Sequence, residues 1–193
     1  MFKLKNLEIL LLINCAFERI SGLDLFNIEV LKLKEFSLNG ISYSIWENYD
    51  ILGKLDGLEN LTLSYIPIKQ AYFSKLNIMC NLSLKILCLD DYFLEFIDLQ
   101  RMEKLEVLEN LYLCNRKFQS CYFHYLGNNC RFFQILQILD LSFLKINLDD
   151  LKYIMKFENK RKLSLMLSNF DLMSVKNFLV ALPLNELSIG CDF

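Results

Sequence analysis

The hydrophobic positions of this chain recur in eight copies of one pattern, L-x-x-L-x-x-L-x-L-x-x-N/C-x-L, with other apolar residues replacing some leucines. The copies begin at positions 4, 25, 55, 81, 105, 133, 157 and 181. Successive starts therefore lie 21, 30, 26, 24, 28, 24 and 24 residues apart. Self-similarity at a nearly fixed period predicts a repeat architecture of about eight units.

The central L-x-L of each copy predicts a short strand, because side chains two residues apart in a strand point to the same face. One copy cannot bury that face alone, so we expect neighbouring copies to stack around one continuous core. The strands should then form one parallel sheet. Their predicted inward pairs are Leu10/Leu12, Leu31/Leu33, Leu61/Leu63, Leu87/Leu89, Leu111/Leu113, Leu139/Leu141, Leu163/Leu165 and Leu187/Ile189.

Between the strands the apolar spacing changes to that of helices. Leu148, Leu151 and Ile154 fall on one helical face, and Asn147 is suitably placed to cap the amino end of that helix. A second helix is predicted over 171–179, and weaker patterns indicate helices over 70–80 and 95–102. The pattern therefore predicts one α/β solenoid domain over residues 1–193, with a concave parallel sheet and convex helices.

The segment 139–151, with its Leu139-x-Leu141-x-x-Leu144-x-Ile146-Asn147 core, resembles leucine-rich repeats. It is most similar to the cysteine-containing and ribonuclease-inhibitor-like subtypes. The resemblance implies protein recognition through the concave face, and many members of these subtypes are adaptors or substrate receptors in ubiquitin ligases. Only Cys15 fits the family's Asn/Cys position, so we expect most of the hydrogen-bonding ladder of that position to be missing.

Residues that alternate with the inward pairs are expected on the solvent-facing, concave side. Tyr112, with Asp90 and Asp140 on neighbouring strands, has the composition of an interaction hot spot for a basic partner. Ordinary solvated strand residues are the alternative interpretation of these positions. The complete candidate set is Tyr112, Asp90, Asp140, Cys88, Thr62 and Lys32.

A second candidate surface is apolar. Ile9, Leu11, Ile13 and Val30 belong to the solvent-facing positions of the first two predicted strands. Such a cluster indicates either a binding patch or a surface that an amino-terminal cap covers.

Composition and charge exclude several function classes. A net charge of −2, from 21 basic and 23 acidic residues, gives no concentrated basic surface for nucleic acid. The longest stretch without charged residues, 118–130, has 13 residues and is too short to span a membrane. The set Cys114, Cys121, His124 and Cys130 matches no standard zinc spacing, and the sequence has no phosphate-binding glycine loop. We therefore predict no catalytic residue, metal or cofactor, and a function in binding an unidentified protein.

Seven cysteines, an odd number without paired spacing, favour free thiols in a reducing compartment, the cytoplasm or the nucleus. The amino terminus resembles a short signal peptide, because Lys3 and Lys5 precede the apolar run 9–17. Glu8 interrupts the approach to that run, and no small-residue cleavage site follows it. A secreted recognition or effector protein is therefore the alternative to an intracellular adaptor, and an enzyme is the least favoured class.

Overall fold

The computed structural model describes residues 6–14, 32–40, 55, 57–65, 83–90, 96–114, 121–157, 159–168, 176, 180 and 183–192. The described strands are β1 (Ile9–Ile13), β2 (Glu35–Asn39), β3 (Asn60–Ser64), β4 (Ile86–Asp90), β5 (Asn110–Cys114), β6 (Ile138–Ile146), β7 (Lys162–Ser168) and β8 (Glu186–Asp192). The described helices are α1 (Phe96–Met102), α2 (Cys121–Asn129), α3 (Phe132–Ile135) and α4 (Leu148–Ile154).

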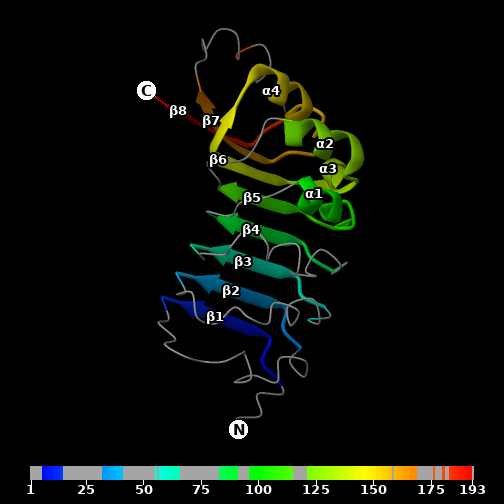
Figure 1. Ribbon diagram of the computed structural model, residues 1–193, viewed down its shortest axis with the longest axis vertical. Helices are drawn as coiled ribbons and strands as arrows, with labels where there is room; N and C mark the ends of the chain where they lie inside the picture. The colour runs from blue at the N-terminus through cyan, green and yellow to red at the C-terminus, as the bar shows by residue number, and fades with distance from the viewer. Residues whose placement is uncertain are drawn as a thin grey trace.

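The eight strands form one open sheet in which every neighbouring pair is parallel and the strand order follows the chain order (Figure 1). Parallel neighbours require the chain to cross back between strands, so each repeat contributes one strand and one return connection. The predicted α/β class and the predicted parallel sheet are therefore confirmed, and the arrangement is compatible with a solenoid.

The second strand lies elsewhere than the pattern predicts. β2 buries Phe36 and Leu38 in place of Leu31 and Leu33, and Phe36 is in register with Leu10 and Leu61. With this pair, the first inward residues of successive strands lie 26, 25, 26, 24, 28, 24 and 24 residues apart. The inward pair of the second strand therefore lies five residues later than the pattern predicts, and this shift accounts for the outlying intervals of 21 and 30.

The core runs continuously along the inner side of the sheet. The inward pairs of β2 to β7 are at most 1% exposed, and burial of each leucine contributes roughly 2 kcal/mol. At the ends, Leu10 and Leu12 of β1 are only partly buried, and Leu187 of β8 is 38% exposed. Inner repeats are therefore packed on both sides, whereas these end strands bury less of their inward pairs.

The helices pack on that same inner side. Leu99 of α1, Phe123 of α2 and Leu151 of α4 belong to the core cluster of the strands, and Figure 1 shows the helices together on one side of the sheet. The predicted helices over 95–102 and from Asn147 are confirmed as α1 and α4. Those predicted over 70–80 and 171–179 fall, except for residue 176, outside the described residues.

Helix α4 begins where the sequence indicates. The side-chain oxygen of Asn147 accepts a hydrogen bond from the backbone N–H of Asp150 at 2.9 Å, and the Asp150 carboxylate accepts one from the backbone N–H of Asn147 at 2.9 Å. This reciprocal pair satisfies two donors that a helix start otherwise leaves without partners. α2 was not predicted, because the sequence places no charged residue within Cys121–Asn129 to mark its ends.

Candidate functional site

The side of the sheet opposite the helices, here called the open face, carries the residues that alternate with the inward pairs. The register places Thr62, Cys88, Tyr112 and Asp140 side by side on β3, β4, β5 and β6. All four are half-buried. The structure therefore brings four of the six predicted site residues into one row across the sheet.

Asp90 lies in the next row of the open face. It is in register with Cys114 of β5 and Ser64 of β3, two residues further along the strands than the row of Tyr112. Five of the predicted residues thus belong to one continuous patch over β3 to β6.

Lys32, the sixth predicted residue, does not belong to this patch. It precedes β2 and is exposed, because the second strand starts at Glu35. The positions that Lys32 and its neighbours were expected to fill are occupied by Glu35, Ser37 and Asn39. Sequence reasoning missed these three residues, although the unequal intervals of 21 and 30 around the second repeat were a signal of the misplacement.

The central patch is acidic. On β3 to β6, between Asn60 and Ser142, the open-face rows contain only two charged side chains, Asp90 and Asp140. Lys162 of β7, the next basic residue along the face, is held by Glu186 of β8 at 2.7 Å. Within the described rows, the patch therefore presents negative charge beside a tyrosine.

Partial burial raises the pKa values of three titratable groups in the patch. Burial raises the pKa of Tyr112, and Asp140 adds to this shift while Lys162 opposes it. Burial, together with Asp140 and Asp90, raises the pKa of the Cys114 thiol to about 12. Burial also raises the pKa of Cys88, against a hydrogen bond with Ser64 that lowers it. Neither thiol forms a thiolate readily, so both are poor nucleophiles.

Asp140 also has a structural partner. Its carboxylate accepts hydrogen bonds from the backbone N–H of Ser142 at 3.0 Å and from the Ser142 hydroxyl. These bonds lie where the β6–β7 pairing shifts register, between Leu141 and Lys145. Asp140 therefore both contributes charge to the patch and holds the local irregularity of β6.

A ladder of alternating charge borders the open face at the amino ends of the strands. The residues that directly precede the first five strands are, in order, Glu8, Lys34, Glu59, Lys85 and Glu109. Lys34 pairs with Glu8 at 3.2 Å and Lys85 with Glu59 at 2.8 Å. From Lys34 onward, the backbone N–H of each of these residues donates a hydrogen bond to the backbone carbonyl of the ladder residue on the preceding strand. Two ion pairs therefore balance four of the five charges of this border, and Glu109, which accepts a hydrogen bond from Gln137 at 3.2 Å, leaves it with a net charge of −1.

The predicted apolar surface is present on β1. Ile9, Leu11 and Ile13 are 54%, 49% and 56% exposed on one side of the strand. Val30, the fourth member of that set, lies outside the described residues. The surface therefore belongs to a single strand at one edge of the described sheet.

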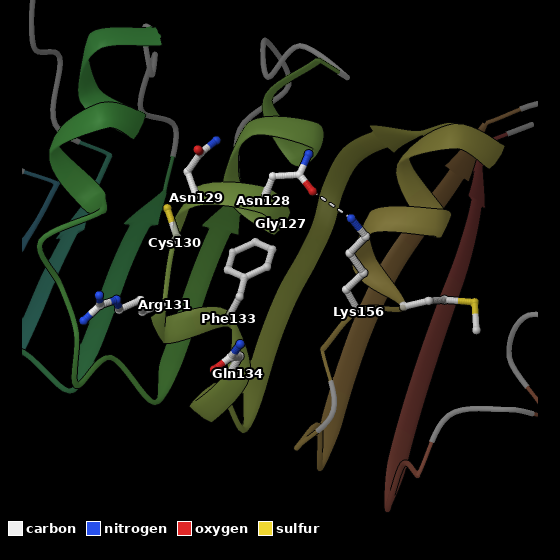
Figure 2. A pocket seen from close by; sticks show the side chains of 9 residues that line it. Gly127, Asn128, Asn129, Cys130, Arg131, Phe133, Gln134 and Lys156 are labelled. Carbon is white, nitrogen blue, oxygen red and sulfur yellow. Dashed lines mark hydrogen bonds between the residues drawn. The ribbon is translucent and has the colours of Figure 1, made fainter.

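A pocket of about 400 Å³ lies on the helical side, between the carboxyl ends of α2 and α4 (Figure 2). Phe133 forms its apolar wall, and Arg131, Gln134 and Lys156 are among its polar lining residues. Lys156 Nζ donates to Asn128 Oδ1 at 2.7 Å. Figure 2 shows this bond between the turn that follows α4 and the carboxyl end of α2. The two helices are thus tied together beside the pocket.

Three of the four residues considered for a zinc site, Cys114, Cys130 and His124, have separate surroundings. Cys114 is on the open face, Cys130 is buried in the core cluster, and His124 packs edge-on against Tyr153 with ring centroids 4.8 Å apart. Among the residues that the structure describes, no group of three or more His, Cys, Asp or Glu side chains is arranged to hold a metal ion.

Comparison with known proteins assigns no relative. The sequence matches no protein-family model, and no curated protein is significantly similar to it. In the described part of the chain, none of the helices combines the length and apolar character needed to cross a membrane. Because these comparisons assign no function, the functional proposal is based on the open face.

Proposed function

We propose that this protein is a leucine-rich repeat module that binds another protein through the centre of its open face and carries out no chemistry itself. The observation that carries this proposal is the patch over β3 to β6. Tyr112 lies there between Cys88 and Asp140, on a surface whose charged side chains are both acidic.

The repeat itself supports the leucine-rich assignment. Seven intervals of 24 to 28 residues separate the inward positions of the strands, which falls in the range of this repeat class. Leu139, Leu141, Leu144 and Ile146, the positions that carry the resemblance, are all at most 1% exposed. Repeats of this kind present successive strands in register, which suits an extended recognition surface.

The chemistry of the patch suits a basic protein segment. A half-buried tyrosine supplies a rigid contact area at a small cost in side-chain entropy, and aromatic residues of this kind dominate interface energetics. Asp90 and Asp140 attract lysine or arginine side chains and disfavour acidic competitors. We therefore assign the partner a positively charged contact region.

We further place the protein in a reducing compartment, the cytoplasm or the nucleus. The described thiols Cys88, Cys114 and Cys130 are free, which supports an environment that keeps cysteines reduced. A secreted recognition protein is the alternative. Sequencing of the mature amino terminus separates the two, because cleavage near residue 17 is expected only for the secreted form.

The binding proposal is tested on a partner isolated by affinity purification and then produced as a pure protein. Tyr112→Ala should weaken binding by about 2 kcal/mol or more, a factor of roughly 30, because it removes the aromatic anchor. The Asp90→Asn/Asp140→Asn double variant should mainly slow association and reduce its dependence on salt. Asparagine at position 140 keeps a side-chain oxygen that accepts hydrogen bonds from Ser142.

Lys156→Ala serves as the control, because it alters the surface beside the helical pocket and leaves the open face unchanged. It should bind the partner as wild type does. Wild-type affinity for both open-face variants would contradict the proposal, and a loss confined to Lys156→Ala would move the interface to the helical side.

A further inference from the structure

The first residues of the central strands form a row on the open face in which two residue types alternate. β3 and β5 begin with asparagine, at Asn60 and Asn110, and β4 and β6 begin with isoleucine, at Ile86 and Ile138. The register places these residues side by side in chain order. The surface of the row therefore repeats at every second strand, and all of its positions are among the described residues.

The border beside this row has the same two-strand period. Lys85, which precedes β4, binds the carboxylate of Glu59, which precedes β3, at 2.8 Å. Gln137, which precedes β6, donates in the same way to the carboxylate of Glu109, which precedes β5, at 3.2 Å. Both glutamates lie in the segment Leu-Glu-Asn-Leu, which the sequence contains twice. Strands β3 and β4 therefore form a unit that β5 and β6 repeat, so a ligand with a matching period contacts both units alike.

Asn60 and Asn110 keep their side-chain amides available for such a ligand. Both residues are half-buried. Their backbone N–H groups donate to the carbonyls of Lys34 and Lys85, but within the described part of the chain no hydrogen bond uses either side-chain amide. A partly buried amide is stabilised by a ligand that supplies a hydrogen-bond partner, because the protein already shields the group from some of the solvent. The two amides therefore indicate a ligand with polar groups at the same two-strand spacing.

Apolar and aromatic side chains lie between and beside these amides. Ile86 and Ile138 are half-buried and flank Asn110 in the row. Tyr112 lies two residues after Asn110 on the same face of β5, and Asp140 is its neighbour on β6. The surface therefore combines amide donors, apolar contact area, a tyrosine ring and a carboxylate.

The period of this surface matches one turn of a polyproline II helix. β4 separates β3 from β5, so Asn60 and Asn110 lie about 9.6 Å apart at the usual spacing of neighbouring strands. A polyproline II helix rises about 3.1 Å per residue with three residues per turn, which gives about 9.3 Å per turn. A β-strand repeats a face at about 6.8 Å and an α-helix turns at about 5.4 Å, so neither matches the period. The polyproline II backbone has no internal hydrogen bonds, so its carbonyl oxygens are free to accept from the amides.

We propose that the open face binds a basic, proline-rich segment of the partner protein in the polyproline II conformation, running across β3 to β6. The side-chain amides of Asn60 and Asn110 donate to carbonyl oxygens three residues apart in this segment. The two isoleucines of the row and the ring of Tyr112 contact its proline rings. Asp140 favours lysine or arginine among the remaining residues of the segment. This inference rests on the proposed function, because it specifies the sequence class and conformation of the partner segment on the same face.

Fluorescent peptides test the conformation and the charge of the segment, with binding measured by fluorescence anisotropy. One peptide contains three repeats of Pro-Pro-Lys, the second three repeats of Gly-Gly-Lys, and the third three repeats of Pro-Pro-Glu. The protein should bind the Pro-Pro-Lys peptide at least about tenfold more tightly than the flexible Gly-Gly-Lys peptide, because the proline peptide loses less conformational entropy. It should bind the Pro-Pro-Glu peptide at least about tenfold more weakly than the Pro-Pro-Lys peptide. Equal affinity for the proline and glycine peptides, or for the basic and acidic ones, would overturn the inference.

Variants of the protein identify the contacts. The Asn60→Ala/Asn110→Ala double variant removes both amides and should bind the Pro-Pro-Lys peptide at least about tenfold more weakly than wild type. Urea titration should give both proteins similar midpoints, because each change is at a half-buried surface position.

Asn39→Ala is the matched control. Asn39 is a half-buried asparagine on the same face of β2, in register with Ser64, which lies four residues further along β3 than Asn60. This variant should bind the Pro-Pro-Lys peptide as wild type does. Wild-type affinity of the double variant, or an equal loss in Asn39→Ala, would overturn the inference.

Binding of the purified partner separates this inference from the proposed function. If Tyr112→Ala weakens partner binding and the asparagine double variant does not, the open face binds the partner and the polyproline II inference is wrong. If the double variant weakens binding of both the partner and the Pro-Pro-Lys peptide, the inference is supported, whatever the effect of Tyr112→Ala. If neither variant weakens partner binding, both the proposed function and this inference are wrong.

Discussion

At the scale of single residues, two glycines adopt the left-handed backbone conformation at turns. Gly40 has a φ of +62°, and a β-carbon placed there would overlap the side-chain oxygen of Asn14, at the equivalent position of the preceding repeat. Gly57 has a φ of +86°, but a β-carbon there meets no atom within 4 Å. A side chain at position 57 would therefore strain only the backbone, whereas one at position 40 would also collide with Asn14.

We expect Gly57→Ala to lower the free energy of unfolding by about 1 kcal/mol, the approximate cost of a left-handed conformation for alanine. Gly40→Ala should cost slightly more, because the side-chain oxygen of Asn14 must also rotate away. Urea titration of each variant measures both losses. Adding Asn14→Gly to Gly40→Ala should recover the extra loss. Equal losses for the two single variants would show that Asn14 moves away at no cost.

At the scale of elements, the connection between α4 and β7 contains a buried lysine where the repeat pattern has a leucine. Lys160 is 1% exposed, and its Nζ donates to the carbonyl oxygen of Ile154, the last residue of α4, at 2.6 Å. The ammonium also lies 5.0 Å from the centre of the Phe157 ring. Lys160 thus adds a side-chain donor to a carbonyl at the end of the helix that also accepts from the backbone N–H of Phe157 at 3.3 Å.

Burial lowers the pKa of Lys160 to about 7 from its usual 10.5. Between these two values the unfolded chain binds the proton and the folded protein does not, so the free energy of unfolding should rise with pH in this window. The expected contribution of Lys160 between pH 7 and pH 9 is about 2 kcal/mol. Urea titrations of wild type and Lys160→Met at several pH values measure it, because other groups titrate alike in both proteins. A difference between the two proteins that stays constant with pH would contradict the burial of a neutral lysine.

The strands were largely predictable from the sequence, because an inward pair with period two recurs wherever a strand must face the core. β2 was the exception, since Leu33 is buried and apolar like an inward residue but precedes the strand. Gly40 was a usable signal, because it aligns with Asn14 once Phe36 and Leu38 are taken as the inward pair. A pattern of apolar residues alone does not distinguish these two placements, whereas the requirement for a left-handed turn does.

Part of the candidate site was also predictable. The row of Thr62, Cys88, Tyr112 and Asp140 follows from the period of the strands and the register of the repeats. The hydrogen bonds between Asp140 and Ser142 depend on the irregularity of β6, which no repeat template contains. Sequence periodicity therefore locates the regular rows of a sheet and misses the positions where the register changes.

At the scale of the whole molecule, the sheet separates two kinds of surface. On its inner side lie α1, α2 and α4, whose side chains enter the common core. On its open side, two ion pairs balance four of the five charges of the ladder from Glu8 to Glu109, and the acidic patch with Tyr112 lies at the centre. We therefore expect a partner protein to cover the open face of the sheet.

Hydroxyl-radical footprinting of the free protein and of its complex with the purified partner tests that claim most directly. Tyr112 reports on the open face, and Phe96 of α1, which is 46% exposed on the helical side, reports on the opposite face. Aromatic rings react with the radical wherever solvent reaches them, so one experiment reads both faces. We expect the partner to protect Tyr112 and to leave the labelling of Phe96 unchanged. Protection of Phe96 with full labelling of Tyr112 would contradict this expectation.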